Sequence, residues 1–506
     1  MDRALRRLEV VGVAIAAVAA VAHALSLAWV CDDAYVCFRY ADNLLAGHGL
    51  VFNAGERVEG YTNFLWTLWI AAGRAAGASP EAWTVAWGAA AFGATVLLIG
   101  LAARRHGRAT GLAAFAPLAA LLAASSRDLA VHATSGLETS AFAFLLVAGF
   151  VLATRDGASA RRLAAAGAVF GLAVLTRPDG AVPAACVAAW LLWNRRALVP
   201  AAAFVAGAAI LVVPHLAWRV LYYGDWVPNT YFAKSADRLW IDQGLFYASL
   251  YFGRWWPLLL AVPVPFLARR VAPLAPATLI GAAYALHVVR FGGDFMHARM
   301  LVPATPFLLL GLDAGVRAVA ARWPVAGWLA AATVAAAWAL QPSDLSGPVE
   351  VRGVTDEWEH YSPDRTDWAD RSRRNGAALA RLFDGLPVRV AFFGGEAALV
   401  WHARPFLAIE CETGLTDREI ARQPIAERGR IGHEKHAGPA YVIGARGAHF
   451  AFHPNAGRVL GLPEAGPDGW ADLGGVPARI LSRDEPLFEE LRRRGARIPG
   501  REPPAP

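Results

Sequence analysis

Long apolar segments follow one another from the N-terminus of the chain to about residue 340. A helix that crosses a bilayer needs roughly 20 mostly apolar residues, and hydrophobic residues make up 56% of the 506 positions. This share is too high for an ordinary soluble globular protein. The sequence therefore predicts a polytopic α-helical membrane protein with about eleven spans, near residues 8–30, 81–103, 109–125, 137–153, 163–176, 180–193, 198–221, 250–268, 273–289, 300–318 and 324–340.

The first apolar segment, residues 10–30, is longer than the apolar region of a typical secretory signal. No persuasive small-residue cleavage site precedes the polar residues that follow it, so we expect a retained membrane anchor.

Arginines orient the predicted spans. Arg3, Arg6 and Arg7 precede the first span, so the positive-inside rule places the N-terminus in the cytoplasm. The same rule assigns the later clusters to the cytoplasm: Arg104, Arg105 and Arg108; Arg155, Arg161 and Arg162; Arg195 and Arg196; Arg269 and Arg270; Arg317 and Arg322. The remaining loops then lie outside the cytoplasm. Because the predicted number of spans is odd, the sequence after the last span is also expected outside. The net charge of +7 is therefore not a nucleic-acid signal, because the cations lack an aromatic-interleaved basic stripe.

The composition changes after residue 340. A linker-like stretch is followed by charged sequence with short strand-like runs and one amphipathic helical pattern. We therefore predict a transmembrane catalytic domain over residues 1–340 and an extracytoplasmic soluble α/β domain over residues 341–506.

Polar residues gather in the predicted outside loops, and the first such loop begins with two adjacent carboxylates. Asp33 is a good N-cap for a helix from residue 34 to residue 46. Asp32, Tyr35 and Arg39 then share one face of that helix. Arg39 suits an anion such as a phosphate, and an aspartate can manage a proton or a metal. The alternative is an ordinary helix face with a cap.

Further charged residues accompany the other outside loops. Ionisable groups at membrane depth are costly and usually mark a substrate path, and this set comprises Lys234, Arg177, Arg290 and Arg299 together with Asp179, Asp294 and His297. Each local motif also has a structural alternative: the "GGDFMHAR" segment as an interhelical turn, "TRPDG" as a common turn, and "SGLET" as a helix cap with Glu138 in the first turn. The histidines of "GHEKH" at residues 432–436 suggest a metal, but such pairs are usually surface residues.

Several of these motifs, in this order, resemble the terminal arabinofuranosyltransferases of mycobacterial cell-wall synthesis and their bacterial relatives, which are GT-C class membrane glycosyltransferases. The resemblance rests on "DDAYVCFRYADNLLAGHGLVFNAGERVEGYTNFLW", "SGLET", "TRPDG", "YYGDWVPNTYFAK", "GGDFMHARMLVP" and "GLTDREIAR" followed by "RIGHEKH". It implies a GT-C fold, location in the bacterial cytoplasmic membrane, and a decaprenyl-phosphoryl arabinofuranose type of donor used at the outer face. The soluble part is shorter than in the mycobacterial enzymes, which leaves the acceptor open between a glycan and a glycoprotein.

The resemblance also implies that Asp32 and Asp33 are catalytic. The remaining assignments rest on residue chemistry and on position in the outside loops, and they make Asp32 and Asp33 the candidate ligands of a divalent metal ion. The residues expected to bind the donor are Arg39, Tyr35, Lys234, Arg299, His297, Asp294 and Arg177. Those expected to bind the acceptor or line the pocket are Tyr61, Asn63, Glu138, Asn229 and Tyr231.

The chemistry of transfer from a lipid-linked sugar agrees with an active site at the outer face of the membrane. A prenyl tail stays in the bilayer while its phosphate sits at the interface, where cations or a metal would stabilise the leaving group. A carboxylate either deprotonates the acceptor hydroxyl or stabilises an oxocarbenium-like sugar. Two alternatives remain: a GT-C transferase for another lipid-linked sugar such as mannose, and a transporter of lipid-linked glycans. A transporter would place polar pairs near mid-span in repeated halves, and the sequence shows neither.

Overall fold

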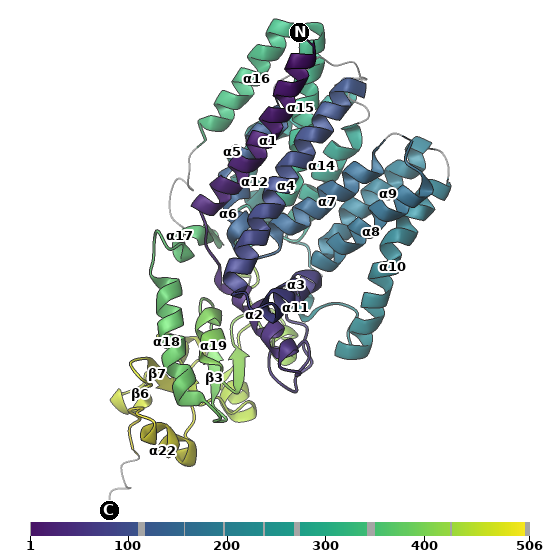
Figure 1. Cartoon of the computed structure of the whole chain (residues 1–506). Coiled ribbons are helices and arrows are strands. Elements are labelled where there is room, and N and C mark those ends of the chain that lie inside the picture. Colours follow the sequence, from purple (N-terminus) through teal and green to yellow (C-terminus); the bar gives the residue numbers. More distant parts are fainter. Residues whose placement is uncertain are drawn as a thin grey trace, which may run out of the picture.

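The computed structural model describes residues 2–109, 117–155, 157–195, 198–235, 238–267, 274–341, 350–425 and 428–500. A bundle of helices holds the N-terminus at its far end, and a smaller mixed part holds the C-terminus (Figure 1). All described strands lie after residue 349. The predicted boundary between residues 340 and 341 stays a prediction, because residues 342–349 are outside the described residues.

Each predicted apolar segment is largely helical where it is described. The long helices of the bundle are α1 (Asp2–Ser26), α4 (Pro80–Ala109), α7 (Thr139–Ala153), α8 (Ala160–Thr176), α9 (Ala181–Arg195), α10 (Leu198–Tyr223), α14 (Ala275–Arg290), α15 (Thr305–Arg322) and α16 (Pro324–Ala339). Shorter ones are α2 (Asp32–Leu45), α3 (Phe64–Ala75), α5 (Leu118–Ser125), α6 (Arg127–Thr134), α11 (Asn229–Ala233), α12 (Ile241–Arg254), α13 (Val264–Leu267) and the 3-10 turns at Pro178–Gly180, Trp256–Ala261 and Val302–Ala304.

Small residues allow helices α8 and α10 to touch through their backbones. A Cβ added at Gly167 would lie 1.8 Å from the carbonyl oxygen of Phe204, and one at Gly207 would lie 1.9 Å from that of Ala164. Membrane helices pack closely through such small residues, since the hydrophobic effect does not drive helices together in lipid.

The predicted count of eleven spans is not confirmed. Among the described residues four helices are long and apolar enough to cross a bilayer, and a fifth span is possible if α6 and α7, bent by 112° at their junction, form one broken span. The difference has a physical reason: α5 and α6 have only 8 residues each, and the segment predicted over residues 250–268 breaks into α12, a 3-10 turn and α13.

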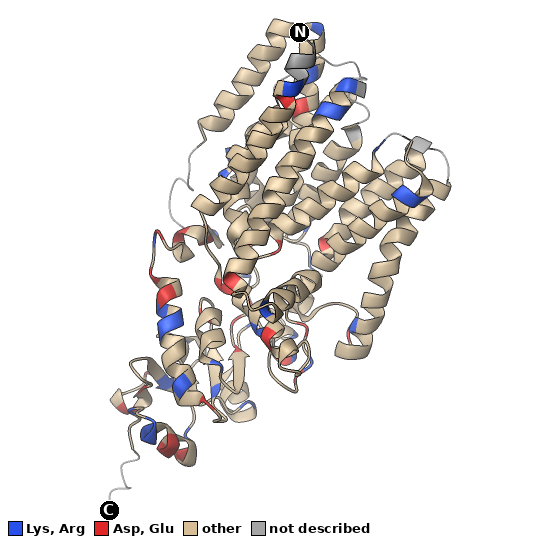
Figure 2. Ribbon diagram, viewed as in Figure 1, with Lys and Arg blue, Asp and Glu red and all other residues tan. Residues whose placement is uncertain are grey.

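Charged groups at the N-terminal end of the bundle pair with one another. Arg317 Nη2 lies 2.9 Å from Glu9 Oε1, and Arg104 Nε lies 3.4 Å from Glu9 Oε2. Lys and Arg residues also mark this end of the bundle, opposite the C-terminal part (Figure 2). Arg269, Arg270 and Arg196 of the predicted cytoplasmic clusters lie outside the described residues.

The C-terminal part contains a five-stranded mixed sheet in the order β4-β3-β5-β7-β6. The strands are β3 (Arg389–Phe392), β4 (Leu407–Glu410), β5 (Phe450–Ala451), β6 (Trp470–Asp472) and β7 (Pro477–Ile480). β3 pairs in parallel with β4 and β5, and β7 pairs antiparallel with β5 and β6. The helices here are α17 (Glu357–Tyr361), α18 (Trp368–Phe383), α19 (Ala397–Ala403), α20 (Arg418–Ala421), α21 (Ala456–Val459) and α22 (Glu485–Arg493), with a π-helical turn at Ala440–Ala445 and a 3-10 turn at Pro467–Gly469. This agrees with the α/β character predicted for the region.

Backbone pairing joins the two parts. The hairpin of β1 (Glu350–Val351) and β2 (Val354–Thr355) lies against the "GGDFMHAR" loop of the bundle, where Met296 and Thr355 form a parallel bridge. Thr355 N donates to Phe295 O at 2.7 Å, and His297 N donates to Thr355 O at 2.9 Å. Helices α2 and α19 form a second contact between the two parts. We call the region between these two contacts the seam.

Candidate functional site

Helix α2 presents its predicted common face to α19 rather than to an open site. The two carboxylate oxygens of Asp32 accept hydrogen bonds from Ala397 N and Ala398 N, at 3.0 and 2.9 Å. Carboxylates are favoured at a helix N-terminus, where backbone N–H groups lack partners. Burial nevertheless raises the pKa of Asp32 to about 7, against the effect of these two bonds.

Tyr35 and Arg39 lie on the same face and are also structural contacts. Tyr35 packs its ring against the rings of Trp401 and Trp368. Arg39 is buried and donates to Phe52 O at 2.8 Å, Asn53 Oδ1 at 3.3 Å and Pro405 O at 3.1 Å. Burial lowers the pKa of Arg39 to about 10. The shared face is therefore present: Tyr35 contacts the C-terminal part, and Arg39 contacts both parts through Asn53 and Pro405. That Arg39 and Tyr35 bind the donor stays a prediction.

Asp33, unlike Asp32, is only half-buried. Within the described part of the chain no hydrogen bond or ion pair is recorded for its carboxylate. Its neighbours are titratable groups of both parts. Burial raises the pKa of Glu357 to about 8; Arg430 opposes this shift, and the charges of Asp33, Asp32 and Asp294 add to it. Asp33 is thus the member of the predicted pair that remains available to a ligand.

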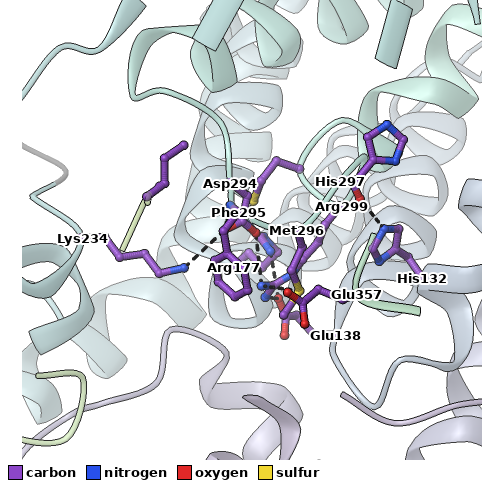
Figure 3. A network of polar contacts seen from close by, with 12 residues as sticks. His132, Glu138, Arg177, Lys234, Asp294, Phe295, Met296, His297, Arg299 and Glu357 are labelled. Carbon is purple, nitrogen blue, oxygen red and sulfur yellow. Dashed lines mark hydrogen bonds and ion pairs between the residues drawn. The ribbon is translucent and has the colours of Figure 1, made fainter. Parts of the chain in front are cut away.

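The "GGDFMHAR" loop supplies Asp294 and Arg299 to this site, and Lys234 joins them from the C-terminal end of α11 (Figure 3). Arg299 Nη1 lies 3.3 Å from Asp294 Oδ2, and Lys234 Nζ lies 3.6 Å from Asp294 Oδ1. Burial would raise the pKa of Asp294, but the charges of Lys234, Arg299 and Arg177 outweigh it and hold that pKa below its usual value. Lys234 keeps 30% of its side chain exposed, so it can reach a ligand that enters the site.

On the bundle side, further buried ion pairs join Asp294 and Arg299 into one cluster of charged residues. Arg177 Nη1 donates to Glu138 Oε1 at 2.9 Å, and Arg177 Nη2 donates to Asp179 Oδ2 at 2.7 Å. Arg299 Nη2 lies 3.6 Å from the same Glu138 oxygen, and Asn63 Nδ2 donates to the other at 2.8 Å. The structure therefore brings together five predicted residues from four distant motifs: Asn63, Glu138, Arg177, Asp294 and Arg299.

His297 does not join this cluster. Its Nδ1 lies 4.0 Å from Asp128 Oδ1, and its backbone oxygen is 2.8 Å from His132 Nε2. Figure 3 shows the imidazole of His297 on the far side of the loop from Lys234. Ala298, between His297 and Arg299, has a φ of 64°, and these two neighbours turn to opposite sides. That His297 contacts the donor stays a prediction.

The remaining predicted pocket residues differ in their surroundings: two have hydrogen-bond partners within the protein, and one borders a cavity. Tyr61 is buried with its hydroxyl 3.0 Å from Tyr223 Oη. Asn229 Nδ2 donates to Gly414 O and Leu415 O at 2.8 and 2.9 Å, which fastens a loop of the C-terminal part. The expected pocket role of both residues stays a prediction. Tyr231, in contrast, lines a cavity of about 420 Å³ beside α20.

Three residues that were not among the predicted site residues, Glu357, Arg430 and His433, lie at the seam with Asp33. Arg430 Nη2 donates to Glu357 Oε1 at 2.8 Å, and its guanidinium lies 4.8 Å from the centre of the Phe295 ring. The ring of His433 meets the same Phe295 ring edge-on at 4.8 Å. Burial lowers the pKa of His433, with Arg430 acting in the same direction. Both Arg430 and His433 belong to the "RIGHEKH" motif, which is the sequence feature that could have identified them as site residues.

The seam does not fit a metal site. Among the residues that the structure describes, no group of three or more His, Cys, Asp or Glu side chains is placed to hold a metal ion. Both oxygens of Asp32 already accept backbone N–H groups, which leaves Asp33 alone from the predicted ligand pair. We therefore derive no step through a metal.

Known proteins resemble this chain in sequence and in fold. No protein-family profile matches it. It is 29% identical over 400 residues to a terminal β-(1→2)-arabinofuranosyltransferase of Mycobacterium tuberculosis, a match that covers 66% of this chain and 62% of that relative. The enzyme of the same name from Corynebacterium glutamicum is 29% identical over 315 residues, covering 54% of this chain and 46% of its own. The chain thus spans less than two thirds of the length of either relative.

Solved structures identify the fold. ArnT from Cupriavidus metallidurans matches with a TM-score of 0.56 in the apo state, at 15% identity, over 95% of this chain and 100% of that one. The same protein bound to undecaprenyl phosphate matches with a TM-score of 0.54, at 14% identity, over 79% and 85% of the two chains. The predicted fold class and the predicted resemblance are both confirmed: the chain has the GT-C glycosyltransferase fold and is a sequence relative of the terminal arabinofuranosyltransferases.

Proposed function

We propose that the chain transfers an arabinofuranosyl residue from a polyprenyl-phosphate donor of the decaprenyl-phosphoryl arabinofuranose type to a glycan or glycoprotein at the outer face of the bacterial cytoplasmic membrane. The observation that carries the proposal is the half-exposed Asp33 carboxylate, which lies without a recorded partner in the described chain beside the cations of the seam. The names of the two sequence relatives support an arabinofuranosyl group as the transferred sugar. The undecaprenyl phosphate bound to crystallised ArnT supports a polyprenyl phosphate as its carrier.

The cations are assigned to the leaving phosphate. Lys234, Arg299 and Arg430 come from three separate segments and lie on the same side of the seam, around Phe295 and Asp294. Cations fixed where negative charge develops stabilise a transition state, and more strongly so in a site that excludes water. Arg299 is anchored by Asp294 and Glu138, so it is preorganised, whereas Lys234 retains freedom to follow the phosphate.

Asp33 is assigned to the acceptor. The glycosidic bond to the phosphate breaks while the acceptor oxygen attacks the anomeric carbon, and the acceptor hydroxyl proton passes to the Asp33 carboxylate. General-base assistance of this kind contributes roughly 10²–10⁴-fold. Asp32 is a positioning residue, because it fixes α2 to α19 and so sets where Asp33 projects.

The decisive experiment supplies the purified protein in lipid nanodiscs with polyprenyl-phosphoryl arabinofuranose and a short arabinofuranoside acceptor, and identifies products by mass spectrometry. The expected product is the acceptor enlarged by one pentose. Parallel reactions with polyprenyl-phosphoryl mannose test the nearest alternative. Transfer of mannose but not arabinose would replace the sugar in the proposal while keeping the fold and the donor class. Movement of intact lipid-linked glycan without any transfer would establish a transporter instead.

A further inference from the structure

The turn between His297 and Arg299 has a strained backbone. Arg299 N donates to His297 O at 2.8 Å, which closes a three-residue turn around Ala298. Ala298 has a φ of 64°, and a turn of this kind with a positive φ at its centre is the rare, strained form of the γ-turn. The same loop has glycine at its two other positions of positive φ, Gly292 and Gly293, where such a conformation carries no steric cost. Alanine at position 298 therefore needs support from its surroundings.

Helix α6 provides this support from two successive turns. His132 Nε2 lies 2.8 Å from His297 O (Figure 3), and because a carbonyl oxygen only accepts, the imidazole of His132 donates through Nε2. The same oxygen thus accepts from His132 and from the backbone of Arg299. On the preceding turn of α6, Asp128 Oδ1 lies 4.0 Å from His297 Nδ1. One helix therefore contacts both the carbonyl group and the side chain of His297, and we call Asp128 and His132 the α6 clamp.

Asp128 is itself fixed in place. Its Oδ2 accepts a hydrogen bond from Trp255 Nε1 at 2.6 Å, and its Oδ1 lies 3.5 Å from Arg254 Nη1. Only 2% of Asp128 and 5% of His132 are exposed to solvent. A carboxylate buried this deeply is costly unless it is paired. These contacts therefore leave the group that faces the His297 ring little freedom to move.

The C-terminal part supports the loop and α6 together. Thr355 of β2 forms backbone hydrogen bonds with Phe295 and His297. The next residue, Asp356, accepts a hydrogen bond from Arg127 Nη1 at 2.9 Å, and Arg127 is the first residue of α6. The loop is thus held at its backbone by β2 and at His297 by α6, and the pair of Arg127 with Asp356 joins the two supports.

The turn sets the position of Arg299. Its guanidinium lies 3.3 Å from Asp294 Oδ2 and 3.6 Å from Glu138 Oε1. For its buried Nε, no hydrogen-bond partner is recorded among the residues that the structure describes. A buried N–H group without a partner is costly, and a phosphate oxygen would satisfy it. A relaxed turn at Ala298 would move Arg299 away from this arrangement, because the side chain follows its backbone.

We propose that the α6 clamp holds the Ala298 turn in its strained form, and that His132 and Asp128 are thereby positioning residues that keep Arg299 in place to bind a phosphate group. The inference rests on the proposed function for the assignment of Arg299 to the donor phosphate, whereas phosphate binding can be measured without any transfer. Both residues of the clamp act through His297 and the turn that follows it.

Binding of farnesyl phosphate, a short polyprenyl phosphate, to the protein in nanodiscs tests the α6 clamp by calorimetry. His132→Phe keeps a ring in the buried position but removes the donor to His297 O. It should weaken binding by roughly tenfold, the effect of losing one well-placed contact from Arg299. His132→Gln supplies an amide N–H at about the reach of Nε2 and should bind within about threefold of the wild type.

Ala298→Gly distinguishes support of the turn from ordinary packing. Glycine adopts a positive φ without support, so adding Ala298→Gly to His132→Phe should recover most of the lost affinity. Ala298→Gly alone should bind like the wild type. If His132 only packed α6 against the loop, the effects of the two substitutions would be independent and would add.

His449→Phe is the matched control. His449 is also buried, and its Nδ1 accepts a hydrogen bond from Arg389 N at 3.1 Å. This variant should melt at a lower temperature without a change in phosphate affinity. Thermal melting is recorded for every variant. If His132→Phe does not fold, Asp128→Asn takes its place with the same expected loss, because it leaves both histidines intact and removes the charge that faces His297.

The outcomes separate the α6 clamp from the proposed function. Weaker phosphate binding in His132→Phe that Ala298→Gly restores, with no transfer from any lipid-linked pentose, would support the clamp and reject the proposed function. Normal transfer with unchanged phosphate affinity in His132→Phe, or in Asp128→Asn where that variant replaces it, would overturn the clamp. Weaker binding that Ala298→Gly does not restore would also overturn it, because the lost group would then act independently of the turn.

Discussion

Asp32 and Asp33 are neighbours in sequence whose carboxylates serve different surroundings: that of Asp32 caps α19 through Ala397 N and Ala398 N, while that of Asp33 is half-exposed at the seam. The divergence follows from helix geometry, because consecutive residues of α2 point about 100° apart. The two substitutions are therefore expected to differ in kind.

Asp33→Asn should reduce the transfer rate by roughly 10²–10⁴-fold, since the amide keeps the size of the side chain but cannot accept the proton. Its melting temperature should match that of the wild type. Asp32→Asn should instead lower stability by about 1–3 kcal/mol, because an amide nitrogen replaces one acceptor of a buried backbone N–H. Initial rates and thermal melting of both variants check this. Full transfer by the Asp33 variant at normal protein levels would remove Asp33 from the mechanism.

Lys234→Gln and Arg39→Gln test which cation meets the donor. Losing one charged hydrogen bond to phosphate costs about 1.5–3 kcal/mol, so Lys234→Gln should weaken binding of a polyprenyl-phosphate analogue by roughly ten- to a hundredfold. Its stability should barely change, since Lys234 is partly exposed.

Arg39→Gln should show the opposite pattern. Its guanidinium satisfies two carbonyl groups and Asn53 in a buried setting, so its loss should cost about 2–4 kcal/mol of stability with donor affinity unchanged in the folded fraction. The two measurements are thermal melting and equilibrium binding of the analogue. Weakened donor binding with an unchanged melting temperature in the Arg39 variant would contradict its structural assignment.

Stability should fall as the pH rises through the neutral range. Burial raises the pKa of Glu396 from 4.5 to about 8, with Asp32 and Glu412 adding to it. A carboxyl whose pKa is higher in the folded state stabilises the fold fully below its unfolded pKa and loses that contribution as the pH rises through the folded pKa. The melting temperature should therefore decline between about pH 4.5 and pH 8.

Glu396→Gln should flatten this decline, because the amide cannot ionise. Glu464→Gln, at an exposed position of the same part, is the matched control and should leave the pH profile intact. An identical slope in wild type and in the Glu396 variant would show that this group does not govern the dependence.

The fold class could be predicted well from the sequence, but the site could be predicted only in part. Apolar length and helical periodicity are local signals, so nearly every predicted span is helical, and linked motifs allowed Glu138, Arg177, Asp294 and Arg299 to be grouped before the fold was known. Which face of α2 meets α19 depends on a partner 365 residues away, and no local pattern encodes it. The contacts of Arg39 with Pro405 and of His297 with Asp128 could not be predicted for the same reason. Arg430 was missed because its partners Glu357 and Phe295 belong to other segments.

The orientation in the membrane gives the last prediction. The arginines near the N-terminal end of the bundle predict a cytoplasmic location for Arg108, which is exposed at the end of α4, whereas Arg493 lies in the C-terminal part expected outside. Arg493→Cys should react with a membrane-impermeant maleimide in intact spheroplasts, and Arg108→Cys only after the membrane is permeabilised. The unsubstituted protein is the background control, because its cysteines at 31, 37 and 411 are buried and Cys186 is half-buried. Labelling of Arg493→Cys only after permeabilisation would place the seam in the cytoplasm. Asp33 would then face the compartment that contains nucleotide sugars, and the lipid-linked donor would lose its rationale.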